Sequence, residues 1–304
     1  MQVGLIGLGK MGFNLALNML EKGLQVVGYA RTPATVARAT EAGVTGVGGL
    51  TELVDRLKPP RVIWLMVPAG PGVDELIEGL APLLAASDII VDGGNSYYKD
   101  TLRRYGAMRN RGLHLADVGT SGGVEGARYG ICAMVGAEKE VFDRLEPLLQ
   151  AICVPGGYLH VGPCGSGHFV KMVHNGIEYG MLQALGEGFE ILARGPFELS
   201  LKEIARLWRH GSVIRGWLMD LLEKALNKES KLESIKGIVH SSGEGLWTAM
   251  TALELGIPAP IIAGSVFMRY RSEQIESFAA KVVAALRYEF GGHEVERGSP
   301  HGAF

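Results

Sequence analysis

The sequence predicts an α/β protein: a doubly wound dinucleotide-binding domain of the Rossmann type over residues 1–164, followed by an all-helical domain over residues 165–304. Three observations lead to this prediction. Short apolar runs alternate with helical patterns in the first half, a glycine-rich turn follows the first apolar run, and only helical patterns appear beyond Gly165. Continuous apolar strands that alternate with helices are typical of a parallel sheet covered on both faces.

Each expected element is a run of residues with the period of its class. The expected strands are short apolar runs at 2–6, 25–29, 61–67, 88–91, 113–118 and 131–135. The helices expected between them have an apolar period near 3.6, at 12–22, 33–42, 51–57, 71–84, 97–110 and 138–149. The helices of the second domain are expected at 166–194, 200–209, 214–226, 244–256, 259–271 and 275–289. Ser200 and Glu203 have the spacing of a capping box, and residues 297–304 are expected to form a loose tail.

The composition excludes several classes of protein. Of the 304 residues, 44 are glycine, about twice the usual share, but they follow no period of three and therefore exclude collagen. A hydrophobic share of 47% excludes a disordered chain, and a net charge of −2 argues against nucleic-acid binding or a basic membrane surface. The three cysteines lack metal-site spacing, and neither a signal peptide nor a membrane span is apparent. We therefore expect a cytoplasmic protein without a metal.

The turn after the first strand carries the pattern Gly7-x-Gly9-x-x-Gly12 and opens the first helix. A turn without side chains lets a pyrophosphate reach the backbone N–H groups at a helix N-terminus. We therefore expect a dinucleotide to bind here. A tight turn that binds no ligand is the alternative.

The end of the second strand favours NADP over NAD. An NAD site usually has Asp or Glu there to bind the ribose 2′-hydroxyl, whereas this chain has Arg31 followed by Thr32. An arginine pairs well with a 2′-phosphate. A solvated surface arginine is the alternative, so NAD stays open.

Two further loops are expected at the carboxyl ends of strands, where open α/β sheets bind their ligands. One is Asp92–Ser96, which contains Asn95. The other is the segment 119–126, which contains Ser121, Gly122 and Gly123. An amide, a hydroxyl and bare N–H groups suit a carboxylate or a sugar hydroxyl. An ordinary turn is the alternative for either loop.

The long helix expected at 166–194 carries four polar residues on one face. Lys171, His174, Asn175 and Glu178 have the spacing i, i+3, i+4 and i+7, which brings them into one stripe between apolar neighbours. A stripe with a candidate base, a candidate acid and two hydrogen-bonding groups is typical of a reaction site. A solvated helix face is the alternative.

Two arginines and a histidine near the end of the chain, Arg269, Arg287 and His293, could bind a phosphate. Taken alone they have another interpretation. A helix-terminal arginine followed by the C-capping glycines Gly291 and Gly292 has the same pattern.

Taken together, these segments resemble the decarboxylating 6-phosphogluconate dehydrogenases, and specifically their short form. The likeness covers nearly the whole chain. It rests on Gly7 to Asn14, Ala30 to Thr32, Met66 to Gly70, Asp92 to Ser96, Asp100 to Arg104, Ser121 to Arg128, Lys171 to Tyr179, Trp247 to Ala249, Phe267 to Arg269 and Arg287 to His293.

The resemblance implies an activity: oxidative decarboxylation of 6-phospho-D-gluconate to D-ribulose 5-phosphate and CO2, with reduction of NADP or NAD. Lys171 would be the general base and then the general acid, and Glu178 would protonate C1 of the enediol. The implied ligands of the sugar acid are Asn95, Ser121, Gly122, Gly123, His174 and Asn175, and those of its phosphate are Tyr179 and Arg269. The implied cofactor site consists of Gly7, Leu8, Gly9, Lys10, Met11, Gly12, Arg31, Thr32, Val67, Ala69 and Asn95.

The resemblance also implies a homodimer or higher homo-oligomer, in which Arg287 and His293 complete the partner subunit's site. Two departures from the longer members stand out. Their Lys-Gly-x-Gly-Lys-Trp stretch reads Ser242-Gly243-Glu244-Gly245-Leu246-Trp247 here, and the duplicated half of their helical domain is missing. A related β-hydroxyacid dehydrogenase that acts on a small non-phosphorylated acid is therefore an alternative. A redox sensor that binds dinucleotide without chemistry is a third.

Overall fold

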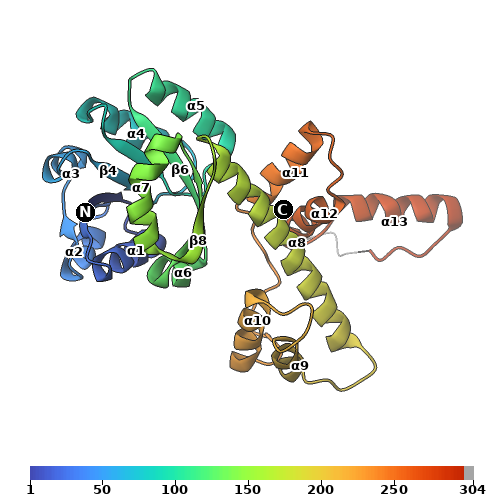
Figure 1. The fold of residues 1–304 in the computed structure, drawn as a ribbon. Coiled ribbons are helices and arrows are strands. Elements are labelled where there is room, and N and C mark those ends of the chain that lie inside the picture. The colour runs from blue at the N-terminus through green and yellow to red at the C-terminus, as the bar shows by residue number, and fades with distance from the viewer. Residues whose placement is uncertain (298–304) are drawn as a thin grey trace. The chain divides into compact units, whose positions relative to one another are not determined.

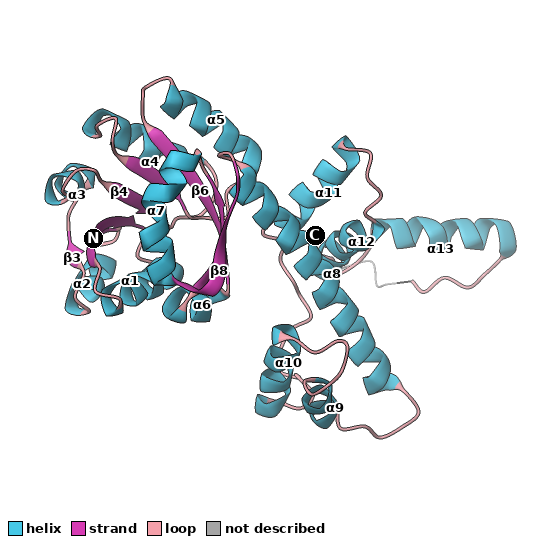
Figure 2. Cartoon of the chain, viewed as in Figure 1, coloured by secondary structure: helices cyan, strands magenta, loops and turns pink. Residues whose placement is uncertain are grey.

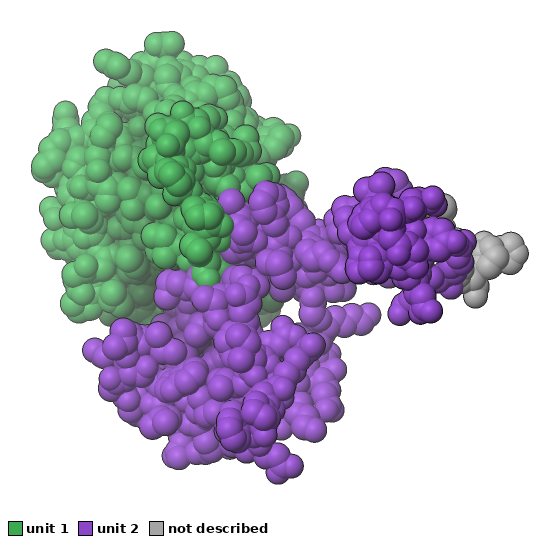
Figure 3. Space-filling model, turned by 90° about the vertical axis from the view of Figure 1, so that its right-hand side faces the viewer, with its two compact units in different colours: residues 1–180, 243–262 green, residues 181–242, 263–304 purple. Residues whose placement is uncertain are grey.

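The structure, a computed structural model, describes residues 1–297. The chain divides into two compact units (Figure 3). The first consists of Met1–Gly180 and Gly243–Ile262, and the second of Met181–Ser242 and the chain from Ala263 onward. The boundary expected between residues 164 and 165 marks the end of the strand pattern, which is a different property from compactness, and it stays a prediction. Of the expected tail, residues 298–304 lie outside the described residues.

An eight-stranded sheet forms the centre of the first unit, in the order β3-β2-β1-β4-β5-β6-β7-β8 (Figures 1 and 2). Neighbouring strands are parallel except for the antiparallel pair of β6 and β7. The strands are β1 (Gln2–Ile6), β2 (Gln25–Tyr29), β3 (Thr45–Gly46), β4 (Val62–Leu65), β5 (Ile89–Asp92), β6 (His114–Ser121), β7 (Ile131–Gly136) and β8 (Cys153–Gly162). The mostly parallel sheet confirms the predicted fold class.

Helices cover both faces of the sheet. Successive strand residues point to opposite sides, so each face carries apolar side chains that a layer of helices buries. On one face, α1, α6 and α7 bury side chains such as Leu15, Ala127 and Leu145. On the other face, α3, α4 and α5 bury side chains such as Leu53 and Ile77. The helices of this part are α1 (Lys10–Glu21), α2 (Pro33–Glu41), α3 (Leu50–Arg56), α4 (Pro71–Leu80), η1 (Ala81–Leu83), α5 (Tyr98–Arg109), α6 (Gly123–Tyr129) and α7 (Lys139–Ile152).

The sequence prediction missed two strands and one helix of this unit. The two-residue β3 is too short to have a pattern. The edge strand β8 contains Pro155-Gly156-Gly157, and Pro and Gly are rare inside strands except at edges and bulges. The segment 119–126 was wrongly expected to be a loop: Gly119 to Ser121 belong to β6, and α6 begins at Gly123 after a turn at Gly122.

Only helices follow β8 in the part of the chain that the structure describes, as predicted. They are α8 (Ser166–Arg194), α9 (Leu201–Trp208), α10 (Trp217–Lys228), α11 (Glu244–Glu254), α12 (Pro260–Glu273) and α13 (Phe278–Gly291). The capping box is confirmed, since Ser200 Oγ accepts a hydrogen bond from the backbone N–H of Glu203. The second unit has a small core of its own around Phe189, Ala205 and Met219.

None of the described helices combines the length and the apolar character that crossing a membrane requires.

Candidate active site

Four loops that carry predicted site residues lie at one edge of the sheet. They follow β1, β4, β5 and β6, which are consecutive neighbours in the sheet and all run parallel. The carboxyl ends of parallel strands meet at the same edge, and open α/β sheets bind ligands there. The topology therefore brings together the glycine turn, the segment Val67 to Gly70, the segment Gly93 to Tyr97, and the turn at Gly122.

The glycine turn after β1 depends on the absence of side chains at two positions. Gly7 has φ +97°, and a Cβ there would lie 2.3 Å from the backbone oxygen of Met66. A Cβ on Gly12 would lie 1.8 Å from the backbone oxygen of Gly7. Larger residues at these positions would push the turn away from β4 and from α1. Both glycines therefore shape the turn itself.

The start of α1 suits an anionic group. Gly9 is its N-cap, and among residues 1–297 no side chain caps the helix or adds an acidic group in its first turn. A Cβ on Gly9 would meet no atom of the described residues within 4 Å, so these residues leave the space above the turn open. Free N–H groups and the positive end of a helix dipole bind pyrophosphate well. These residues fit the phosphates of a dinucleotide.

The remaining predicted cofactor residues lie around this turn. The side chain of Leu8 is fully buried in the core, so only its backbone can face a ligand. Lys10 is exposed and Met11 is partly buried against the same core. Arg31 and Thr32 are both exposed at the end of β2, with Thr32 at the N-cap of α2. An exposed Arg31 is compatible with a 2′-phosphate and with the solvated alternative.

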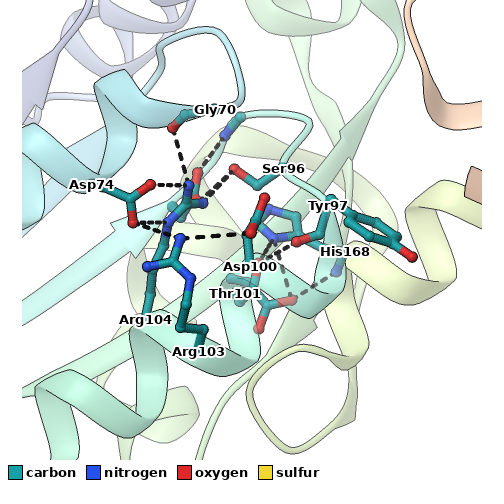
Figure 4. A network of polar contacts seen from close by, with 12 residues as sticks. Gly70, Asp74, Ser96, Tyr97, Asp100, Thr101, Arg103, Arg104 and His168 are labelled. Atoms are coloured by element: carbon teal, nitrogen blue, oxygen red, sulfur yellow. Dashed lines mark hydrogen bonds and ion pairs between the residues drawn. The ribbon is translucent and has the colours of Figure 1, made fainter.

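A buried arginine connects the loop after β4 to the loop after β5 (Figure 4). Arg104 of α5 donates to the backbone oxygen of Gly70 at 3.0 Å and to both carboxylate oxygens of Asp74 at 3.0 Å. It also donates to Ser96 Oγ at 3.3 Å, and Ser96 in turn donates to Asp92 at 2.7 Å. The hydrogen bond from Arg104 lowers the pKa of Asp74, which keeps its carboxylate charged. This network fixes the backbone on both sides of Asn95.

The carboxylate of Asp117 fixes the start of α8. Asp117 of β6 is buried and accepts hydrogen bonds from the backbone N–H of Gly165 at 2.5 Å and of His168 at 2.7 Å. Burial raises the pKa of Asp117. The ring of His168 makes a 2.7 Å hydrogen bond to Thr101 Oγ1 of α5 (Figure 4). The first turn of α8 is thus tied to both β6 and α5, one turn before Lys171.

The polar stripe of α8 faces the end of β6. His174 Nδ1 lies 3.4 Å from Lys171 Nζ and 3.0 Å from Asn175 Oδ1. The other ring nitrogen, Nε2, lies 3.2 Å from Ser121 Oγ, and a Glu178 oxygen is 4.0 Å from Nδ1. Lys171 and Asn175 are buried, at 6% and 8% exposure, so the stripe is not a wholly solvated face. The structure brings these five predicted residues together.

Burial changes the acid–base behaviour of the central lysine. Removal of water around Lys171 lowers the pKa of its ammonium group, while the negative charges of Glu178 and Glu244 partly raise it. A lysine with a lowered pKa loses its proton more readily and is therefore better suited to act as a general base.

Glu244 also contacts the loop after β5. Glu244 begins α11, is 6% exposed, and accepts a 3.1 Å hydrogen bond from Asn95 Nδ2. Its helix is anchored on α8, where Thr248 Oγ1 donates to the backbone oxygen of Met172 at 2.8 Å. Asn95 therefore lies beside α11 as well as beside the sheet edge.

The other predicted phosphate ligands are dispersed along the helices. Tyr179 is buried on α8 in the first unit. Arg269 of α12 belongs to the second unit and donates to the backbone oxygen of His240 at 3.0 Å. Arg287 and His293 are exposed at the end of α13. Gly292 caps that helix with φ +61°, so the capping role of this glycine is confirmed.

Sequence reasoning missed three residues that shape the site: Glu244, Asp117 and Gly119. Glu244 stands between two glycines at the start of a helix, which is an unusual place for a buried acid. Asp117 is a charged residue inside an apolar strand, and Gly119 is a glycine inside the same strand. Such residues signal a buried polar partner and a close backbone approach. The sequence contains these signals, but it does not indicate which residue each of the three contacts in the folded protein.

Two family descriptions match the chain in succession. Residues 2–162 match the NAD binding domain of 6-phosphogluconate dehydrogenase, and residues 167–285 match the C-terminal domain of 6-phosphogluconate dehydrogenase. The YqeC protein of Bacillus subtilis is 52% identical over 98% of this chain and 100% of its own length. The NAD(+)-dependent, decarboxylating 6-phosphogluconate dehydrogenase of Haloferax volcanii is 43% identical over 98% of this chain and 99% of its own.

Solved structures agree with these matches. The 6-phosphogluconate dehydrogenase of Plasmodium falciparum, studied with NADP+ and with 6-phosphogluconate, has a TM-score of 0.82 at 31% identity. The likeness covers 99% of this chain and 67% of that one. The 3-hydroxyisobutyrate dehydrogenase of Mycobacterium tuberculosis has a TM-score of 0.72 at 19% identity over 94% of this chain and 99% of its own, which shows a common fold alone. The chain belongs to the 6-phosphogluconate dehydrogenase family, and its first part is that family's NAD-binding domain.

Proposed function

We propose that the protein catalyses the oxidative decarboxylation of 6-phospho-D-gluconate to D-ribulose 5-phosphate and CO2, with reduction of NADP or NAD. The buried Lys171 in a stripe with His174, Asn175 and Glu178 carries this proposal. The Haloferax volcanii relative, which bears the name of this activity and matches over nearly its full length, supports it.

Lys171 has two successive tasks in this proposal. As a neutral amine it removes the proton of the C3 hydroxyl while the hydride on C3 leaves, which gives a β-keto acid. The nicotinamide ring, when bound, accepts that hydride. The protonated Lys171 then returns its proton to the C3 oxygen as the C1 carboxylate leaves as CO2, because the electron pair of the broken bond moves toward that oxygen. A buried lysine with a lowered pKa suits both tasks.

Glu178 completes the reaction. The enediol left after CO2 departs needs one proton on carbon, at C1 of the pentulose. Glu178 lies one turn beyond His174 on the same stripe and is half-exposed, so it can exchange protons with water between turnovers. As the ketone forms, the C2 hydroxyl of the enediol loses its proton to the now neutral Lys171. Proton exchange with water then restores the carboxylic acid of Glu178 and the neutral amine of Lys171 before the next turnover.

The remaining predicted residues bind the two ligands. Asn95, Ser121, Gly122, Gly123, His174 and Asn175 would bind the sugar acid, and Tyr179 and Arg269 its phosphate. The turn from Gly7 to Gly12, with Val67 and Ala69, would bind the dinucleotide. Arg31 and Thr32 favour NADP, while the NAD(+)-dependent Haloferax relative supports retaining NAD as a possible cofactor. In a homodimer or higher homo-oligomer, Arg287 and His293 would reach the partner subunit's site.

A second candidate is oxidation of a small non-phosphorylated 3-hydroxy acid without decarboxylation. Ser242 and Leu246 favour it, because they stand where longer members have lysines that would attract a phosphate. Against it, three groups near the end of the chain, Arg269, Arg287 and His293, are of the type that binds phosphate. Such groups are of no use to a small acid.

A panel of acids tests the proposal. The purified protein is assayed for cofactor reduction with 6-phosphogluconate, gluconate and 3-hydroxyisobutyrate, with NADP and with NAD. We expect turnover of 6-phosphogluconate and near-complete loss of it in Lys171→Met, with cofactor binding retained. Turnover of 3-hydroxyisobutyrate with none of 6-phosphogluconate would contradict the proposal. A redox sensor would bind the dinucleotide without oxidising any of the three acids, and Lys171→Met would leave its function intact.

A further inference from the structure

The carboxylate of Glu244 is buried beside groups that are proposed to bind an anionic substrate. Its Oε1 accepts the 3.1 Å hydrogen bond from Asn95 Nδ2, across 149 positions of sequence. A carboxylate repels a sugar acid and is costly to bury. The buried carboxylate of Glu244 therefore needs a chemical reason, and the proposed reaction steps of Lys171 and Glu178 do not supply one.

The hydrogen bond decides which end of the Asn95 amide faces Glu244. A carboxylate can only accept hydrogen bonds, so the NH2 group of the amide must point toward it. The carbonyl oxygen Oδ1 then points the other way and is left to accept a hydrogen bond. In this orientation Oδ1 accepts from an O–H or N–H donor, and the negative charge of Glu244 beside the NH2 group disfavours a second carboxylate there. The sequence alone left both choices open for this side chain.

Glu244 is held in place by its own helix. Thr248 Oγ1 donates to the backbone oxygens of Met172 and Glu244, both at 2.8 Å, which joins the first turn of α11 to α8. A Cβ on Gly176 would lie 2.7 Å from Thr248, so this glycine permits the close approach. The ring of Trp247 stacks on Tyr97, two residues after Asn95, at a centroid distance of 4.9 Å. The carboxylate is thus fixed relative to both Lys171 and Asn95.

Glu244 also contributes charge around Lys171. Among the described residues, His174 on α8 contacts Lys171, and charges on Glu178 of α8, Glu244 of α11 and Cys132 of β7 act on it. Burial lowers the pKa of Lys171, and Glu178, Glu244 and Cys132 raise it in decreasing order. Two carboxylates on different helices therefore stabilise the ammonium form that must exist midway through the reaction.

We propose that Glu244 is a positioning residue of the reaction, which holds the Asn95 amide with Oδ1 toward a substrate hydroxyl and helps the buried Lys171 to carry a proton. The inference rests on the proposed function for the identity of that substrate. Glu244 would favour the hydroxyl-bearing part of the acid beside Asn95, since its negative charge disfavours a carboxylate or phosphate beside Asn95.

Two substitutions separate the two roles. Glu244→Asp keeps the charge but is one methylene shorter, so it should raise the KM for the acid about tenfold through the lost charge-assisted hydrogen bond. Its acidic limb of kcat/KM against pH should stay in place. Glu244→Gln removes the charge, so the pKa of Lys171 should fall further and the acidic limb should move to lower pH by about one pH unit. The matched control is Glu254→Gln on the same helix, where an exposed ion pair with Lys99 is lost.

A double-mutant cycle tests whether Glu244 acts through Asn95. Glu244→Asp should lower kcat/KM about tenfold in the wild-type background and less than about twofold in Asn95→Ala, because coupled residues are not additive. Equal losses in both backgrounds would contradict the positioning role. A wild-type KM in Glu244→Asp would contradict it as well.

The charge role has a test that needs no substrate. Acetylation of Lys171 in the free protein, followed over pH by peptide mass spectrometry, reports the protonation of this amine directly. The midpoint should lie at lower pH in Glu244→Gln than in the wild type and in Glu254→Gln. An unmoved midpoint would overturn this role. If the wild-type protein oxidises another hydroxy acid instead of 6-phosphogluconate, the proposed function fails, and the same variants assayed on that acid still decide the role of Glu244.

Discussion

The backbone of Gly119 lies directly against the side chain of Lys171. A Cβ built on Gly119 would fall 2.3 Å from Lys171 Cβ and 2.8 Å from the backbone oxygen of Gly167. Real Cβ atoms do not approach other atoms so closely. The hydrogen of this glycine therefore allows α8 to pack on β6, and the position of the proposed base depends on it.

Gly119→Ala should displace Lys171 and lower kcat about a hundredfold, because a displacement of about 1 Å at a reacting group has an effect of this order. Cofactor binding at the glycine turn, which follows a strand three places away in the sheet, should be retained. The measurement is kcat together with the cofactor Kd. Gly106→Ala is the matched control, since a Cβ there meets nothing within 4 Å. Full activity of Gly119→Ala would show that Lys171 does not need this position.

Gly9→Ala and Gly12→Ala should affect different properties, namely dinucleotide binding and thermal stability. A Cβ on Gly9 meets no protein atom, so Gly9→Ala should keep the melting temperature and raise the Kd for the dinucleotide, whose phosphates need that space. A Cβ on Gly12 would clash with the backbone oxygen of Gly7, so Gly12→Ala should lower the melting temperature without any ligand. Thermal unfolding with and without NADP distinguishes the two. Normal NADP binding by Gly9→Ala would show that the phosphates of the dinucleotide bind at another position.

Arg31→Ala should raise the KM for NADP about tenfold and leave the KM for NAD unchanged, because only NADP has the 2′-phosphate that the guanidinium would bind. Kinetics with both cofactors measure this preference. Arg56→Ala is a suitable control, since its exposed ion pair with Glu52 lies on α3. An unchanged NADP preference in Arg31→Ala would support the solvated-arginine interpretation.

Mixed oligomers can test whether Arg287 serves the partner subunit. In the single chain no residue of α13 is buried, although the helix is rich in apolar residues, as expected for an interface. Lys171→Met and Arg287→Ala should each be inactive alone. Co-expressed, they should recover about a quarter of wild-type activity, because half of the dimers are mixed and each mixed dimer has one intact site. Absence of any recovery would mean that Arg287 does not complete a partner's site.

The fold was predictable wherever a segment had one clear period. The strand at 2–6 and the long helix at 166–194 were placed at the bounds that the structure gives. The edge strand β8 was not, because Pro155 and its two following glycines break the apolar run, and an edge strand tolerates them. The antiparallel direction of β7 depends on the short connection through α6, which also has no pattern of its own.

The site was predictable where its residues share one helix. Helical spacing alone brought Lys171, His174, Asn175 and Glu178 to one face, and the structure places them in contact. The contact between Asn95 and Glu244 joins two elements of the tertiary structure, and no local pattern encodes it. A single sequence therefore indicates which groups do chemistry more readily than which groups orient them.

Oxidation of 6-phosphogluconate that carries carbon-13 in its carboxyl group tests the proposed reaction most directly. Reduced cofactor is followed by absorbance, and labelled CO2 is collected from the same reaction. We expect one labelled CO2 for each nicotinamide reduced, and neither product from Lys171→Met. Cofactor reduction with the label retained in a keto acid, or no reduction at all, would contradict the proposed oxidative decarboxylation.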